Sequence, residues 1–395
     1  MTSLVRPRYA PEFSIRLGDQ ELPAAVRASV TGVKLENGLE AASRVEVSLA
    51  NTNLRWLQKH IRGLGFSPFP AGIRIGELPA PPASGTEGLF DIDTKLTLAL
   101  GYAPDPLQEM FIGEITGVEA SFPTDDMPGL TLVAHDYLHR LAQGTSARGF
   151  GPLFDYVIAA ILSVENRLIP FIEPTVIAGS VVMGTLNAIF KVSGTKQKAQ
   201  SHLQLLAEIA ATYDSEYHVD GDVLYITRFM KEYAPRLTLA WGESLLDFAP
   251  RITSVGQAFG VGMKITLREI PLDFLVKVYW DFERESVGIV VVPGAAEGAA
   301  PGKSSFTIIN RPVGSPADIA SSALLLVHEL RTKLNNRLTA TGTAIGDPRI
   351  RAGAVVRFEN LGPDFSGDYR VVSATHSVGS GGYRTQFKVR REMIP

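Results

Sequence analysis

The sequence predicts a mainly β protein with a small α+β insert, and three observations carry this prediction. Alternating apolar and polar residues, typical of half-buried strands, recur through residues 26–134 and again through residues 237–391. Between these regions, residues 154–164 and 199–213 carry apolar side chains at helical spacing. An Asp-Gly pair at residues 220–221 lies between two alternating apolar arms, which predicts a β-hairpin within the insert.

Composition limits the class of protein. A chain of 395 residues has room for two or three domains of roughly 100–200 residues each. The 38 Lys and Arg residues against 41 Asp and Glu residues give a net charge of −3, so no general field attracts nucleic acid. The absence of cysteine excludes a disulfide scaffold, thiolate zinc sites and a cysteine nucleophile, and it fits assembly in a reducing cytoplasm. With no apolar run of about 20 residues and no signal-peptide core, we expect a soluble protein.

The first β region is expected to contain most of its strands before residue 135. Strands are predicted at residues 26–35, 45–49, 95–102, 109–121 and 130–134. A turn is expected at Asn37-Gly38, and a helix is expected from about residue 136 to 141 with Asp136 as its N-cap. Residues 63–88 are rich in Gly and Pro and predict a long loop, which in a large assembly would contact a neighbour.

The insert and the second β region follow the same rules. In the insert, one helix is expected after Pro152 and another after Thr195, followed by the hairpin. In the second β region, strands are predicted at residues 252–255, 263–267, 275–281, 287–292, 306–309, 354–359, 370–377 and 383–390. A helix is expected to begin at Ser315-Pro316, because a hydroxyl can cap it and Pro fits its first position. Its predicted buried face is formed by Ile319, Ala323, Leu326, Leu330 and Leu334.

The last strand alternates without interruption. Its two faces consist of Tyr383, Thr385, Phe387 and Val389 on one side, and Arg384, Gln386, Lys388 and Arg390 on the other. Such alternation predicts one packed face and one face that is solvated or docked. The basic face could be a plain solvated surface, or it could line a channel or contact an adjoining ring.

The end of the chain resembles the closing barrel of the phage late control D family, the baseplate hub proteins of contractile tails. The same module forms the N-terminal half of VgrG-type spike proteins in type VI secretion. The matching elements near the C-terminus are residues 346–348, Gly353, residues 367–369, His376 and residues 381–383. Upstream, residues 111–118 resemble a strand of the family, and residues 135–141 resemble the helix that follows it. The match covers most of the chain in the expected order.

This resemblance implies two tail-tube-like β-barrel domains that flank a small α+β domain. The implied division is residues 1–144, 145–236 and 237–395, the last with one long helix at 316–337. It also implies a structural hub rather than an enzyme, without a cofactor or a metal. Three such chains would form a ring of six similar barrels that adapts the sixfold tail tube to a threefold spike. In this arrangement the basic stripe of Arg384, Gln386, Lys388 and Arg390 would face the channel or a neighbouring ring.

The resemblance also implies partners and a location. Because the chain stops at Pro395 without a fused spike, the central spike is expected to be a separate protein. Further expected partners are other copies of the chain and the tail tube or tube-initiator proteins, with baseplate wedge and tape-measure proteins as additional candidates. The expected location is the baseplate of a virion or an injection particle, assembled in the bacterial cytoplasm.

Two alternative functions belong to other classes, an enzyme and a carbohydrate-binding or adhesive protein. His135 and His139 have the i, i+4 spacing of a helical metal site, so a metal-dependent hydrolase is the main alternative. No obvious third ligand follows them, and a metal assay on the purified protein would separate the metal-dependent hydrolase from the structural hub.

Residues 298–304 are one residue short of a phosphate-binding loop, and Pro301 within them predicts a flexible linker. A carbohydrate-binding or adhesive β protein gains little support from an aromatic content of 8%.

Overall fold

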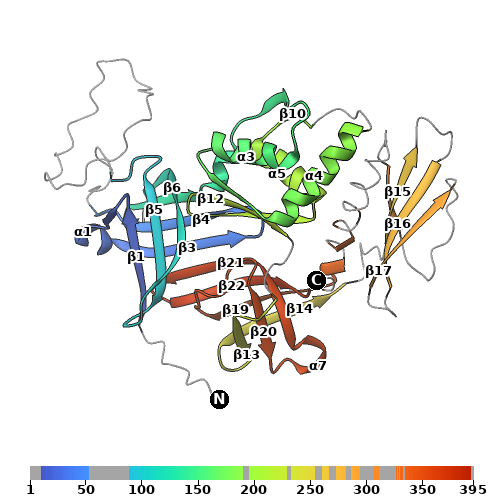
Figure 1. Cartoon of the computed structure of the whole chain (residues 1–395). Helices are drawn as coiled ribbons and strands as arrows, with labels where there is room; N and C mark the ends of the chain where they lie inside the picture. The colour runs from blue at the N-terminus through green and yellow to red at the C-terminus, as the bar shows by residue number, and fades with distance from the viewer. Residues whose placement is uncertain are drawn as a thin grey trace, which may run out of the picture.

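The computed structural model describes residues 10–52, 89–189, 195–228, 233–253, 260–266, 273–281, 286–293 and 306–310, then 326, 328, 330, 331 and 334–392. Within these residues, one large and mostly antiparallel sheet dominates the molecule, and three smaller sheets lie beside it (Figure 1). The predicted mainly β fold class is confirmed. None of the described helices is long and apolar enough to cross a membrane.

The first β region forms a six-stranded unit around an apolar core. Its elements are β1 (Pro11–Leu17), β2 (Gln20–Glu21), α1 (Ala24–Arg27), β3 (Val30–Gly38), β4 (Ala41–Ala50), β5 (Lys95–Tyr102), β6 (Gln108–Ser121), β7 (Gly129–Asp136) and α2 (Leu138–Ala142). The strands lie in the order β1-β5-β6-β7-β4-β3, with β2 paired to the outer edge of β1. Val45, Val47 and Leu49 fill the core of this unit, as their alternation predicts.

Two boundaries in this unit differ from the sequence-based prediction. Residues 26–27 belong to α1, so the predicted strand at 26–35 begins later, at Val30. The predicted turn at Asn37-Gly38 is wrong, because both residues pair with β21 (Gly367–Gly379) from the far end of the chain. The chain instead reverses at residues 39–40, where Glu40 adopts a φ of 55°.

The insert combines helices with two small sheets. Its elements are β8 (Ser146–Gly149), α3 (Asp155–Glu165), β9 (Ile169–Ile172), α4 (Pro174–Ile189), β10 (Lys196–Gln200), α5 (His202–Thr212), β11 (Ser215–Asp220) and β12 (Val223–Arg228). The predicted helix at 154–164 and the hairpin are confirmed. The second predicted helix starts later than residue 199, because residues 196–200 form β10 against β8. A capping box then starts α5: Ser201 Oγ accepts from Gln204 N, and Gln204 Oε1 accepts from Ser201 N.

The second β region forms another six-stranded unit. Its elements are β13 (Leu237–Ala240), β14 (Leu245–Ile252), β19 (Leu338–Ile345), β20 (Val355–Glu359), α7 (Gly362–Phe365), β21 and β22 (Gly382–Arg390), and the strands lie in the order β13-β20-β21-β22-β19-β14. Phe358, Tyr369 and Phe387 form the aromatic centre of its core. Of the strand predicted at residues 252–255, Ile252 ends β14 and residues 254–255 lie outside the described residues, and β19 was not predicted.

A separate four-stranded sheet stands at the right of Figure 1, in the order β17-β16-β15-β18. It consists of β15 (Gly260–Thr266), β16 (Asp273–Asp281), β17 (Ser286–Pro293) and β18 (Phe306–Asn310), close to the four predicted strands. Leu326, Leu330 and Leu334 are helical and fully buried, as predicted. The predicted helix start at residues 315–316, the phosphate-loop-like segment 298–304 and the long loop 63–88 lie outside the described residues.

The two six-stranded units share one topology. Strands correspond as β1 with β13, β3 with β14, β4 with β19, β5 with β20, β6 with β21 and β7 with β22, both along the chain and across the sheet. Each pair of neighbours is antiparallel in both units, except that β13 and β20 run parallel where β1 and β5 run antiparallel. The units therefore form an internal structural duplication.

Matching bulges fix this duplication residue by residue. The β6–β7 register shifts between Ile115 and Gly117, and the β21–β22 register shifts at the corresponding place, between Val371 and Ser373. The β3–β4 and β14–β19 registers likewise shift at one corresponding place each, around residues 31 and 246. Because these bulges lie at equivalent positions, they align the residues of β3, β4, β6 and β7 one by one with those of β14, β19, β21 and β22.

The two units join edge to edge through β3 and β21. These strands pair antiparallel from Ser373 opposite Gly38 to Gly379 opposite Gly32. The result is one run of eight strands in the order β6-β7-β4-β3-β21-β22-β19-β14. Figure 1 shows the blue strands of the first unit beside the red strands of the second. The division into domains at residues 144 and 236 remains a prediction.

Candidate assembly surface

The last strand, β22, separates its two faces as predicted. Tyr383, Thr385, Phe387 and Val389 are buried in the cores, whereas Arg384, Gln386 and Lys388 are exposed. Strand β22 is central, with β19 on one side and β21 on the other, so its backbone is held along its length. The exposed side chains are therefore presented from a rigid strand rather than from a loop.

Two aromatic rings on the buried face of β22 cover glycines of the neighbouring segment. A Cβ added to Gly342 would lie 2.8 Å from Cζ of Phe387, and one added to Gly346 would lie 2.1 Å from Cγ of Tyr383. Only glycine leaves room for these rings, which pack directly on the backbone. This contact fixes the register of β22 and thereby the positions of the exposed residues between the two rings.

The exposed side of β22 belongs to a larger surface, which we call the polar face. It is the face of the eight-stranded run that carries Lys34, Glu36, Arg44, Glu46, Thr341, Thr343, Ser373, Thr375, Arg384, Gln386 and Lys388. Across the strands, Thr343, Gln386, Thr375 and Glu36 form one row, because each is the register partner of the next. The polar face thus crosses the junction between the two units.

Charge is not distributed evenly over the polar face. On β3 and β4, Lys34 Nζ lies 2.5 Å from Glu36 Oε1, and Arg44 Nη1 lies 2.6 Å from Glu46 Oε1. The hydrogen bond to Glu36 raises the pKa of Lys34. Among the described residues, Arg384 and Lys388 have no acidic partner. On β22, by contrast, Arg384 and Lys388 leave positive charge without a partner among the described residues of this face.

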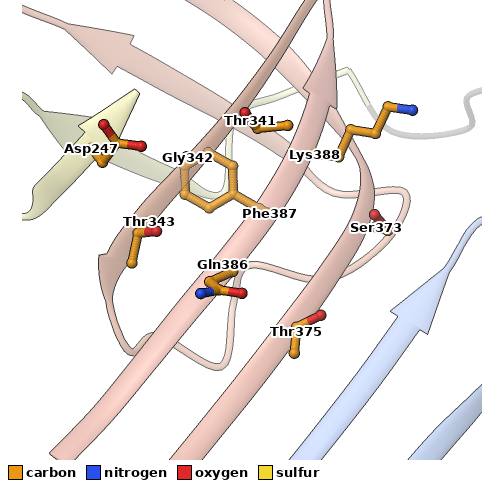
Figure 2. A pocket seen from close by; sticks show the side chains of 9 residues that line it. All are labelled: Asp247, Thr341, Gly342, Thr343, Ser373, Thr375, Gln386, Phe387 and Lys388. Carbon is orange, nitrogen blue, oxygen red and sulfur yellow. The ribbon is translucent and has the colours of Figure 1, made fainter. Parts of the chain in front are cut away.

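A shallow hollow of about 290 Å³ opens on the polar face beside β22 (Figure 2). It is lined by Asp247, Thr341, Gly342, Thr343, Ser373, Thr375, Gln386, Phe387 and Lys388, from four adjacent strands. Its polar groups are mainly hydroxyls, with one amide, one ammonium and one carboxylate. This lining offers hydrogen bonds and charge to a docked surface.

Arg390 differs from the other cations of the last strand. Its Nε donates to Glu392 Oε1 at 2.8 Å, and its side chain is only 15% exposed. Arg390 alternates with the buried residues as predicted, but its charge is neutralised within the chain. The exposed part of the predicted stripe therefore consists of Arg384, Gln386 and Lys388.

The two histidines of the alternative metal site lie close together but have other partners. His135 Nδ1 lies 2.7 Å from Thr116 Oγ1, and His139 Nδ1 lies 2.6 Å from the Asp136 carbonyl oxygen. Asp136 ends β7 instead of starting α2, yet its carboxylate accepts from Leu138 N, as a cap would. The described residues contain no group of three His, Asp or Glu side chains arranged to hold a metal.

His376 occupies a fully buried polar site under the closing strands. Its Nε2 donates to the Ile350 carbonyl oxygen at 2.9 Å, so Nδ1 is the acceptor facing the hydroxyls of Tyr383 and Thr385 at 2.9 and 3.0 Å. Burial lowers the pKa of His376 to about 4. The imidazole is therefore neutral and structural, and it connects β21, β22 and the loop before β20.

This site predicts an acid sensitivity of the fold. Below its ordinary pKa of 6.5, the unfolded state binds a proton that folded His376 does not bind until pH approaches 4. Stability should therefore fall between pH 7 and pH 4.5, by roughly 2–3 kcal/mol from this residue. Urea unfolding of His376→Gln and of the unaltered chain at both pH values checks this. An equal loss of stability in both proteins would contradict it.

The structure also contains a functional contact that sequence reasoning missed. Arg370 on β21 binds Glu216 on β11 through two hydrogen bonds of 2.5 and 2.6 Å, which ties the insert to the second six-stranded unit. The Arg370 side chain is only 4% exposed. Because 154 residues separate the two partners, no local spacing could reveal the pair. The only available signal was a charged residue between the apolar residues Tyr369 and Val371.

Comparison with known proteins finds the same architecture in solved structures of tail proteins. No protein-family model and no curated protein matches the sequence. Among solved structures, the 43 kDa tail protein of prophage MuSo2 from Shewanella oneidensis is 14% identical with a TM-score of 0.61, covering 97% of this chain and 99% of its own. The tail protein of Neisseria meningitidis MC58 is 11% identical with a TM-score of 0.60, covering 97% of both chains.

A third solved structure comes from a secretion system. The Escherichia coli c3393 protein, described as a component of the type VI secretion system that is structurally similar to T4 tail proteins, is 9% identical with a TM-score of 0.52. The match covers 96% of this chain and 80% of that protein. These identities are low, but the coverage extends over nearly the whole chain in each case. The predicted resemblance is confirmed at the level of the fold: this chain has the phage tail-protein fold that the type VI secretion component shares.

Proposed function

We propose that this chain is a structural subunit of the baseplate hub in a contractile tail or injection device. The observation that carries the proposal is the internal duplication, in which two equivalent six-stranded units join edge to edge. Three chains would contribute six equivalent units to a closed ring, which suits a boundary between sixfold and threefold structures. The shared fold with phage tail proteins supports the same role.

In this proposal the polar face lines the passage or contacts the adjoining ring. A sheet presents one face to its core and the other to its surroundings, and the polar face crosses both units without an exposed apolar break between β4 and β19. Arg384 and Lys388 then offer positive charge that no described acidic residue pairs with, and Gln386 between them offers an amide. A separate spike protein and the tail tube are the proposed partners, and the baseplate is the proposed location.

We assign no catalytic activity to the chain. Supporting this assignment, His135 and His139 are engaged by Thr116 and by the Asp136 carbonyl, and His139 Nε2 also lies 3.2 Å from Glu114 Oε1. Glu114 is in turn bound by Arg140 from α2. These contacts serve the packing of α2 against β6, which is a structural task.

The polar face can be tested by charge reversal. Arg384→Glu combined with Lys388→Glu should leave a folded subunit, because single exposed charges rarely change stability by more than about 0.5 kcal/mol. Arg390 is left unchanged, because its reversal would place a second carboxylate beside Glu392. We expect the double variant to fail in ring assembly or in delivery by reconstituted particles.

The matched control reverses two cations outside the polar face. Lys196 and Lys198 are exposed on β10 of the insert, so Lys196→Glu with Lys198→Glu changes the net charge equally. Particles from this control should assemble and deliver normally. Normal assembly and delivery by the Arg384/Lys388 variant as well would reduce the stripe to a solvated surface.

A further inference from the structure

Within the part of the chain that the structure describes, the eight-stranded run ends in two open strand edges. At one end, residues 117–121 of β6 pair with β7 on one side, and no other described strand lies along their second side. At the other end, β19 is the only described strand that pairs with β14. Open edges carry unpaired backbone donors and acceptors and are ready to pair with another strand.

The duplication identifies the strand that each edge would accept. Strand β6 corresponds to β21, and β14 corresponds to β3. Within the chain, these partner strands are already joined, since the second side of β21 pairs with β3. The open edge of β6 is therefore equivalent to the edge of β21 that pairs with β3, and the open edge of β14 is equivalent to the edge of β3 that pairs with β21. The β6 edge of one copy thus matches the β14 edge of another.

We propose that β6 of one copy pairs antiparallel with β14 of a second copy, in the register that joins β21 to β3. The bulges transfer this register directly. Thr375 opposite Glu36 becomes Glu119 opposite Arg251, Ser377 opposite Lys34 becomes Ser121 opposite Ala249, and Val378 opposite Val33 becomes Phe122 opposite Phe248. This inference rests on the proposed hub function, and it adds the two surfaces and the alignment through which copies join.

Side chains on the polar face fit this register. Glu119 and Arg251 are both exposed, and neither has an ion-pair partner among the described residues. In the transferred register they lie directly opposite each other, where opposite charges on adjacent strands attract. A shift by one residue would place the two charges on different faces of the joined sheet.

Side chains on the core face fit it as well. Phe122 is 62% exposed and Ile252 is 57% exposed, so covering them would remove apolar surface from water. The register sets Phe122 opposite the half-buried Phe248 and Val118 opposite Ile252, so a second copy would bury both. Pro250, the counterpart of Leu35, lacks an N–H group, so this pairing has one backbone hydrogen bond fewer than the β3–β21 junction.

This contact is compatible with the closed ring of the proposed hub. Each copy uses two different edges, so the contact is heterologous, and such contacts form rings when the rotation closes. Each added copy repeats the β3–β21 junction once more. The joined sheets would then continue the polar face from one copy to the next.

Cysteine cross-linking tests the inference cleanly, because the natural chain contains no cysteine. In the full-length double variant Glu119→Cys with Arg251→Cys, mild oxidation should give covalent dimers and trimers on non-reducing gels, ending at three copies. The two positions lie on opposite end strands of the eight-stranded run, and a disulfide within one chain would be recognised because it leaves the product at the size of a single chain. Cross-linking also captures transient contacts, so a stable ring is not required.

Two control pairs define the register. Glu36→Cys with Thr375→Cys is the equivalent pair inside the chain and should form an intrachain disulfide. Val118→Cys with Arg251→Cys is shifted by one residue and should yield roughly tenfold less intermolecular product. If the Glu119/Arg251 pair gives no more product than the shifted pair, the proposed pairing is wrong.

Charge reversal gives a second test in the same chain. With Ser121→Cys and Ala249→Cys as the reporter pair, Glu119→Arg alone or Arg251→Glu alone should lower the cross-linking yield several-fold. The two reversals together should restore it. If the natural chain forms a three-copy hub while neither cross-links nor reversals respond, the hub proposal stands and the strand-edge inference fails. If no three-copy hub forms at all, the hub proposal itself fails.

Discussion

Phe387→Ala is expected to destabilise the protein by roughly 3–5 kcal/mol, through lost burial and the cavity that remains. The Phe387 ring is only 4% exposed and lies 5.5 Å from the Phe358 ring between centroids. It also packs on the backbone of Gly342, which has no side chain of its own to cover it. Losing the ring therefore uncovers the backbone of β19 and removes the centre of the second core.

Urea unfolding of the purified chain measures this loss. Gln386→Ala is the matched control, because it truncates the neighbouring residue on the opposite, exposed face of the same strand. Its effect should stay within about 0.5 kcal/mol. A Phe387→Ala loss below about 1 kcal/mol would mean that the second core does not depend on this ring.

Arg370→Ala is the second substitution with a large expected effect, about 3–5 kcal/mol. Removing the guanidinium leaves the Glu216 carboxylate in a mostly buried site without its two hydrogen bonds. Removing one partner of a buried, hydrogen-bonded ion pair costs far more than the intact pair contributes. The insert should therefore loosen from the second six-stranded unit.

A double-mutant cycle separates this coupling from simple loss of volume. Arg370→Met and Glu216→Leu should each destabilise strongly, whereas the two together should recover most of the stability, because neither member of this pair remains without the other. Unfolding free energies of the three variants provide the measurement. If the two single losses simply add in the double variant, Arg370 and Glu216 do not depend on each other.

The strands were predictable from sequence where one face is buried in a core and the other is exposed. β22 alternates cleanly because one side meets two cores and the other meets none, and β5 was predicted with its observed bounds. The turn at Asn37-Gly38 was misplaced because its strand partner lies at the other end of the chain. Helix α4 was not predicted, since its 16 residues carry no charge and no apolar stripe stands out against a polar face.

The family resemblance implied two similar barrels, but the residues themselves do not reveal the duplication, for a related reason. Equivalent positions in the two units hold chemically different residues, each matched to a different neighbour. Glu114 and Arg370 occupy corresponding places on β6 and β21, yet each binds a partner of opposite charge, Arg140 in one case and Glu216 in the other. Likewise, Leu132 in one unit takes the position of Phe387 in the other. Only the strand order and the bulges preserve the relationship.

The candidate surface was predicted in part. Alternation identified Arg384, Gln386 and Lys388, and it also placed Arg390 on the correct face. Alternation could not show that Glu392 neutralises Arg390, because Glu392 lies beyond the end of the strand. The open edges of β6 and β14 were also invisible, since an edge is defined by the strand that is missing beside it.

The central claim is that this chain forms a ring of three. Native mass measurement of the hub, either with its spike partner or released from the particle, tests this most directly. The account predicts three copies of the 42.7 kDa chain in each hub, which supply six equivalent units. A hub with any other number of copies, or a chain that remains single in the intact particle, would contradict it.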